Sequence, residues 1–112
     1  MKQIELTEEH KSKLLEMCKV LFPEYYEIYF GEWDYNGEFD GYLYFSTETL
    51  PNPNVYQIHW FEFCMKILAR KIYNNNIGKT KTTYSSFVME CVIINLNHPI
   101  DYLYYEFKKL KL

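Results

Sequence analysis

The sequence of 112 residues has few of the features that mark common enzyme or membrane classes. Its three cysteines, Cys18, Cys64 and Cys91, are far apart and form no C-x-x-C pair, which argues against a disulfide framework and a zinc ribbon. None of its four glycines belongs to a phosphate-binding loop. No apolar run approaches the roughly 18 residues of a membrane span, and no signal peptide is visible. We therefore expect one cytoplasmic domain over residues 1–112.

Histidine is equally scarce, and the three that are present indicate no metal or catalytic site. His59 and Glu62 are three residues apart with Cys64 nearby, but no second ligand pair follows. We expect His59 to make a structural hydrogen bond near the core, His98 to mark a helix boundary and His10 to lie on a charged surface. The cysteines fall on apolar stripes and are predicted to be small buried hydrophobes. The sequence thus predicts no catalytic residue, no metal and no cofactor.

Basic residues are missing from one long segment, EYYEIYFGEWDYNGEFDGYLYFSTETL at 24–50. Its 27 residues contain no Lys, Arg or His, but they contain seven carboxylates and ten aromatic rings. As a result, residues 1–50 have a net charge of −7 and residues 51–112 a net charge of +4. Surfaces that serve only solubility mix the two signs, because unbalanced carboxylates repel each other. Rings beside the carboxylates add contact area at low entropic cost, which is typical of a binding surface.

The same segment predicts a β-hairpin. Asn36-Gly37 is a preferred pair for a type I′ turn, and the flanking aromatic residues favour strands at 26–35 and 38–46. This turn pairs Tyr35 with Glu38, Trp33 with Asp40, Gly31 with Tyr42, Tyr29 with Tyr44 and Ile28 with Phe45, unless a bulge at Gly31 or Gly41 shifts the register. Alternation of side chains predicts a core face that comprises Tyr26, Ile28, Phe30, Leu43 and Phe45.

Helices are expected around the hairpin. Thr7 caps a first helix that ends at Pro23, and Asn54 begins a second helix with capping-box spacing. Residues 84–96 fit a helix or a strand, and we favour a helix because no alternation is sustained. His98-Pro99 opens the last helix. The predicted fold class is α+β in the order α-β-β-α-α-α, with the antiparallel hairpin, or a slightly larger sheet, packed on a helical layer.

The solvated face of the hairpin is the predicted site. Its carboxylates can pair with Arg and Lys as phosphates do, and its rings can accept cation–π contacts. Such a face complements a basic protein surface that otherwise holds nucleic acid. The predicted partner-binding residues are Glu27, Tyr29, Glu32, Trp33, Asp34, Tyr35, Glu38, Asp40, Tyr42 and Tyr44.

Two segments, IHWFEFCMKIL at 58–68 and HPIDYLYYEFKKL at 98–110, resemble short phage and mobile-element proteins and cover under a quarter of the chain. A small, acidic, tyrosine-rich chain without a catalytic motif also resembles the inhibitors that phages and mobile elements make against host defences, above all anti-CRISPR proteins. These inhibitors share no sequence motif, so no functional residue is carried over. The resemblance implies a non-enzymatic inhibitor in the host cytoplasm. It would bind an RNA-guided nuclease, with an RNA-guided RNA nuclease as the expected target, and occupy its nucleic-acid channel or disturb guide-RNA binding.

Three alternatives stay open. The first is a nucleic-acid-binding accessory protein that contacts RNA or DNA through a basic region comprising Lys66, Arg70, Lys71, Lys79 and Lys81. The second is a protein that sequesters a nucleotide signal, which predicts a pocket with a basic residue beside tyrosine rings. The third is an enzyme, which requires a cleft that exposes His59 or a cysteine.

Overall fold

The computed structural model describes residues 6–35, 38–47, 54–75, 83–89 and 98–110, and the side chains of 32–40 are outside this description. Helix α1 (Glu8–Leu21) precedes three strands, β1 (Glu27–Tyr35), β2 (Glu38–Ser46) and β3 (Val55–His59). A continuous helical segment then comprises α2 (Trp60–Phe63), the π-helix η1 (Cys64–Leu68) and α3 (Ala69–Asn75). The short helix α4 (Tyr84–Met89) and the helix α5 (Pro99–Lys108) complete the described fold.

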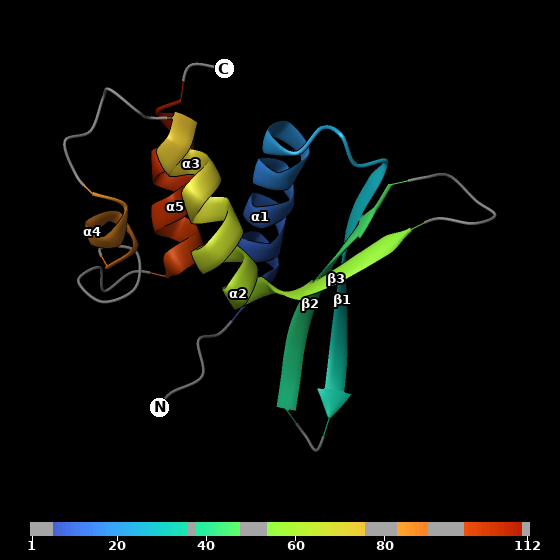
Figure 1. The fold of residues 1–112 in the computed structure, drawn as a ribbon. Helices are drawn as coiled ribbons and strands as arrows, with labels where there is room; N and C mark the ends of the chain where they lie inside the picture. The colour runs from blue at the N-terminus through green and yellow to red at the C-terminus, as the bar shows by residue number, and fades with distance from the viewer. Residues whose placement is uncertain (1–5, 36–37, 48–53, 76–82, 90–97, 111–112) are drawn as a thin grey trace.

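The fold is α+β, as predicted. The strands form an antiparallel sheet in the order β1-β2-β3, and the helices gather beside one end of it (Figure 1). Helix α4 lies on the side of the helical layer that is farthest from the sheet (Figure 1). The turn ends of β1 and β2 project beyond the helices, so only part of the sheet is covered by them (Figure 1).

The hairpin register is confirmed. Tyr29 pairs with Tyr44 and Trp33 pairs with Asp40, and the pairing continues without a bulge from Glu27 opposite Ser46 to Tyr35 opposite Glu38. The turn pair itself, at 36–37, lies outside the described residues. Register is strongly determined here because a shift by one residue would turn the buried side chains of this strand pair toward solvent.

The predicted helix start at Asn54 is wrong. Residues 55–59 form β3, which pairs with the second edge of β2, and the helix begins only at Trp60. Strand formation there satisfies backbone groups along β2 that a hairpin alone would leave unpaired. The loop before β3 is closed by a hydrogen bond of 3.0 Å from the Thr47 backbone N–H to the Asn54 carbonyl.

The core lies between the sheet and the helices. Its fully buried side chains come from α1, β2, the α2–η1–α3 segment and α5, and the largest are Leu14, Met17, Leu43, Phe63, Leu68, Ile72, Ile100 and Leu103. Ile28 and Phe45 are buried as predicted, and Phe30 is half-buried. Tyr26, in contrast, is 64% exposed, so its assignment to the core is wrong. The preceding residue, Tyr25, packs on Phe45 instead, with 5.1 Å between ring centroids.

All three histidines of the sequence accept hydrogen bonds at helix N-termini through Nδ1. The Phe61 N–H donates to His59 at 3.3 Å, and the Ile100 N–H donates to His98 at 3.1 Å. His10 completes the capping box of α1, where its Nδ1 accepts from the Thr7 N–H at 3.4 Å. The predicted helix start at Thr7, the helix-boundary role of His98 and the structural role of His59 are therefore confirmed.

The ambiguous segment at 84–96 is described only in part. Its first six residues form the helix α4, where Phe87 is buried, and this agrees with the preference for a helix. Residues 90–97, which include Cys91, lie outside the described residues.

Candidate protein-binding surface

The side chains that alternate with the buried residues of the sheet lie on its other face. Tyr29, Tyr44 and Gln57 are opposite one another and form one row across the three strands. In a second row, Tyr42 on β2 is opposite His59 on β3. We call this described set the aromatic face: Glu27, Tyr29, Tyr42, Tyr44, the buried Ser46, Val55, Gln57 and His59.

Rings on the aromatic face contact one another across the strands. Tyr29 and Tyr44 stack with 5.1 Å between centroids and 5° between ring planes. Tyr42 meets His59 edge to face, with 5.4 Å between centroids and an angle of 83°. Such cross-strand pairs stabilise a sheet by about 0.2–1 kcal/mol each. Tyr29 nevertheless remains 40% exposed, so its ring is both held in place and available for contact.

Gly31 allows the Tyr44 ring to adopt this position. A Cβ atom on Gly31 would lie 2.5 Å from Cε2 of Tyr44, which is closer than real carbon contacts. The ring therefore lies across a backbone position that only glycine leaves open. In the sequence, Gly31 is a glycine within a predicted strand, which indicates a bulge but not the position of the Tyr44 ring.

The aromatic face contains no Lys or Arg among its described residues, and its carboxylate, Glu27, is exposed. The structure thus brings four of the ten predicted partner-binding residues together, namely Glu27, Tyr29, Tyr42 and Tyr44. The side chains of the other six, Glu32, Trp33, Asp34, Tyr35, Glu38 and Asp40, lie outside the described residues. They continue the same two strands in backbone register.

Three of the five residues of the predicted basic region are described, and each makes a different contact. Lys66 donates to the Glu62 carboxylate at 3.1 Å. Arg70 lies over the ring of Tyr84 in α4, whereas Lys71 lies 5.4 Å from the centroid of Phe22 at the end of α1. Lys79 and Lys81 are outside the described residues. The basic region as a whole therefore stays a prediction.

A polar cluster between α1 and α5 was not predicted. His10 Nε2 lies 3.1 Å from Asp101 Oδ2, and Lys13 Nζ lies 2.9 Å from Asp101 Oδ1. His10 is thus partly enclosed between two helices instead of lying on an open charged surface. Partial burial pushes the pKa of Asp101 upward, but the hydrogen bonds and charges of Lys13 and His10 outweigh it and leave the pKa below its ordinary value.

This cluster also aligns a hydroxyl, an imidazole and a carboxylate, because Thr7 Oγ1 lies 2.9 Å from His10 Nδ1. The Thr7 hydroxyl oxygen, however, accepts the backbone N–H of His10 at 3.2 Å as the N-cap of α1. The arrangement is therefore explained by helix capping and by the link between α1 and α5. Its members are far apart in sequence, so no local pattern could have revealed it.

The described cysteines behave as predicted. Cys18 and Cys64 are fully buried, and burial raises the pKa of the Cys18 thiol to about 12. A thiol in that state is protonated at neutral pH and is a poor nucleophile. Among the described residues, no group of three or more His, Cys, Asp or Glu side chains is arranged to hold a metal ion.

Comparison of the chain with protein-family models, with curated proteins and with solved structures found no match. No helix in the described part of the chain is both long enough and apolar enough to cross a membrane. The function must therefore be inferred from the residues of the site itself.

Proposed function

We propose that this domain is a non-enzymatic binding protein whose aromatic face engages a basic surface of a partner protein. The observation that supports the proposal best is the two pairs of contacting rings, Tyr29 with Tyr44 and Tyr42 with His59, on one face of the sheet. They lie on a face with an exposed carboxylate and no described Lys or Arg. Ordered rings such as Tyr29 and Tyr44 lose little entropy on binding, and they offer flat faces to Arg and Lys side chains.

The proposed partner is a protein that normally binds nucleic acid. Carboxylates on the hairpin would pair with its Arg and Lys side chains in place of phosphates, and the rings would pack on the same side chains. The charge excess would accelerate association and make it sensitive to salt. We propose inhibition of a host-defence nuclease, with an RNA-guided RNA nuclease as the first target to test, in a host cytoplasm. This choice of target follows the resemblance to anti-CRISPR proteins.

The test is inhibition of RNA cleavage by a purified RNA-guided RNA nuclease, measured against the concentration of the domain. We expect the native domain to slow cleavage and Tyr29→Ala with Tyr44→Ala to weaken inhibition by about tenfold or more, because interface tyrosines are frequent hot spots. Glu27→Lys should weaken inhibition most at low salt. The matched control is Tyr105→Ala, which removes a ring that is 59% exposed on α5.

If all of these variants inhibit as well as the native domain does, the proposed site is wrong. If the native domain binds none of a panel of RNA-guided RNA nucleases, the proposed target class is wrong. The double variant Trp33→Ala with Asp40→Lys extends the test to the projecting end of the hairpin. A gel-shift assay with RNA and DNA at low salt separates this proposal from a nucleic-acid-binding accessory protein, which would bind without any partner protein.

A further inference from the structure

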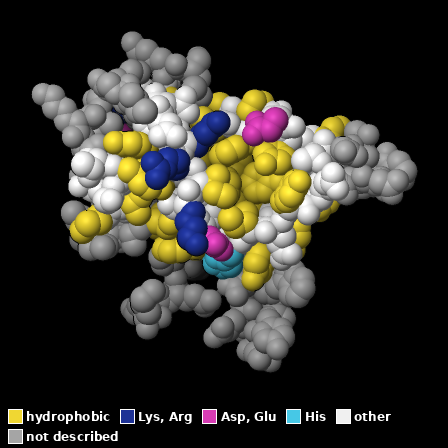
Figure 2. All heavy atoms as spheres, viewed as in Figure 1, with side chains coloured by type: hydrophobic (Ala, Val, Ile, Leu, Met, Phe, Trp, Pro, Cys, Tyr) yellow, Lys and Arg dark blue, Asp and Glu magenta, His cyan; other side chains and the backbone are white. Residues whose placement is uncertain are grey.

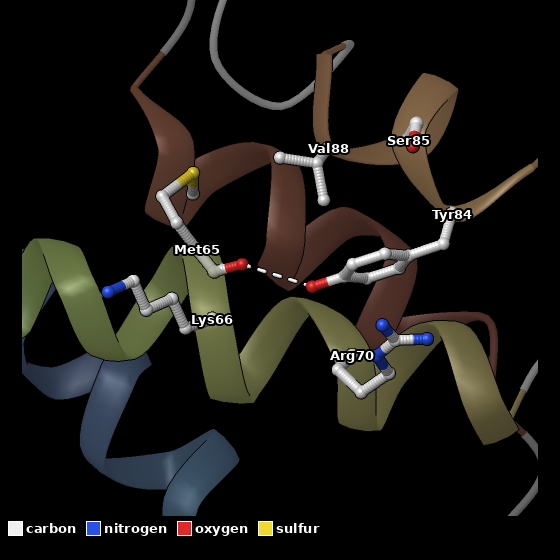
Figure 3. Close-up of a pocket in the computed structure, with 6 residues that line it drawn as sticks. All are labelled: Met65, Lys66, Arg70, Tyr84, Ser85 and Val88. Carbon is white, nitrogen blue, oxygen red and sulfur yellow. Dashed lines mark hydrogen bonds between the residues drawn. The ribbon is translucent and has the colours of Figure 1, made fainter.

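A second site stands on the helical side of the molecule, away from the aromatic face. The helix from Trp60 to Asn75 changes to π-type hydrogen bonding at Cys64–Leu68. Single π-turns widen a helix and often occur at functional sites. Here the Met65 carbonyl accepts a hydrogen bond of 3.1 Å from the Tyr84 hydroxyl, which fixes α4 against the widened turn (Figure 3).

The Tyr84 ring in turn supports a cation. The guanidinium carbon of Arg70 lies 3.7 Å from the ring centroid, and Figure 3 shows the guanidinium below the ring. Stacking holds the flat group in one orientation, and the N–H groups at its edge remain available for two parallel hydrogen bonds to a phosphate or carboxylate. Arg70 is the sole arginine in the sequence. Among the described residues, no carboxylate forms an ion pair with it.

These residues line an open pocket of about 490 Å³ together with Lys66, Ser85 and Val88. In Figure 3, Met65 and Val88 provide an apolar side above Tyr84, and the Lys66 ammonium points away from Arg70. That ammonium is already paired with Glu62, so Arg70 is the principal cation. Figure 2 shows that Lys and Arg side chains occur on this helical part of the surface, beside hydrophobic ones.

The lining combines two cationic side chains, two hydroxyls and two apolar side chains, and it contains no carboxylate. This combination suits a small molecule that has an anionic group at one end and a flat or apolar body at the other. The volume is within the roughly 300–1,000 Å³ that is usual for small-ligand sites. From this geometry we infer that the pocket binds a nucleoside monophosphate, with its phosphate on Arg70 and its base against Met65 and Val88.

The test is an NMR titration of the full chain with UMP and AMP, followed through the Arg70 side-chain Nε–H and the α4 backbone amides. We expect saturable shifts at these positions with the nucleotides and none with uridine. Arg70→Gln should reduce affinity roughly tenfold or more, because it removes a charge-assisted hydrogen-bonding group. The matched control is Lys108→Gln, which removes a cation that lies 5.0 Å over the Tyr104 ring on another helix.

Ser85→Asp provides a second variant, because Ser85 is exposed and a carboxylate there would repel phosphate without disturbing the core. Loss of nucleotide binding in this variant supports the site even if Arg70→Gln fails to fold. The inference is overturned if uridine or inorganic phosphate binds as tightly as UMP. It is also overturned if Ser85→Asp binds UMP normally, or if a short single-stranded RNA binds while the mononucleotides do not. None of these results depends on the aromatic face.

Discussion

Replacing His98 tests the capping role of the histidines and the ring stack that they form. His98 is the N-cap of α5, where its Nδ1 accepts the Ile100 N–H at 3.1 Å. The same ring lies 3.8 Å from the His10 ring, between centroids, and 5.3 Å from the buried ring of Trp60. One imidazole therefore caps a helix and fills a three-ring stack that joins α1, α2 and α5.

The two contributions can be separated with two variants. His98→Ala removes both the cap and the stack, whereas His98→Asn retains an N-cap acceptor and removes only the stack. An N-cap contributes about 1 kcal/mol, and the two ring contacts together contribute roughly 1–2 kcal/mol. We therefore expect His98→Ala to lower the free energy of unfolding by about 2–3 kcal/mol and His98→Asn by about 1 kcal/mol less than that.

Urea unfolding measured by circular dichroism checks these values, provided that the slope of the transition is the same for all three proteins. A difference of about 1 kcal/mol between the variants would also separate their melting temperatures by roughly 4 °C in a domain of this size. Equal losses of unfolding free energy in the two variants would refute the contribution of the cap, because the asparagine would then have restored no stability. A loss in His98→Asn that is close to zero would refute the contribution of the stack.

Three further predictions concern single groups. Tyr84→Phe removes the hydroxyl that donates to the Met65 carbonyl, so thermal unfolding should show a loss of about 1 kcal/mol, whereas Tyr56→Phe, at a ring that is 58% exposed, should show almost none. The pKa of Asp101 is lowered despite partial burial. Its contribution to the free energy of unfolding is therefore present above about pH 4 and is lost as the pH falls through the folded-state pKa. The stability difference between the native protein and Asp101→Asn should therefore shrink in acid-titrated urea experiments, and a constant difference would argue against it. The Cys18 thiol should resist alkylation at pH 8 until the protein unfolds, as peptide mass mapping would show, and rapid labelling of the folded protein would contradict its burial.

The hairpin could be predicted because its information is local. A two-residue turn determines which residues face each other, and alternation then assigns the faces, so the register from Glu27 to Ser46 agrees with the sequence. β3 could not be predicted in the same way, since its pairing partner is a separate strand. Ile58 fits both the strand and the apolar stripe of the following helix, and Asn54 offered a plausible helix cap. The edge of β2 that β1 leaves unpaired favours the strand over the helix, and this edge is not apparent from the local sequence.

The same distinction holds for the sites. Four members of the predicted binding surface lie on one face because strand alternation determines their direction. The Asp101 cluster and the Arg70 pocket join residues from different helices, and their contacts depend on how the helices pack. Tyr84 gave no signal in the sequence, since its role depends on a π-turn 19 residues away. Contacts between side chains that are far apart in the sequence depend on how the helices pack, and local sequence patterns do not specify this packing.

The distribution of ion pairs bears directly on the acidic segment. The ion pairs that the structure describes all join residues of the helices or their ends, as in Lys13 with Asp101 and Lys108 with Glu16. Glu27, which is exposed on the aromatic face, has no ion-pair partner among the described residues. These ion pairs lie within helices or between α1 and α5, so the lysines that form them do not neutralise the described carboxylate of the sheet. No described cation neutralises Glu27, so its carboxylate is available to the basic partner surface that we propose.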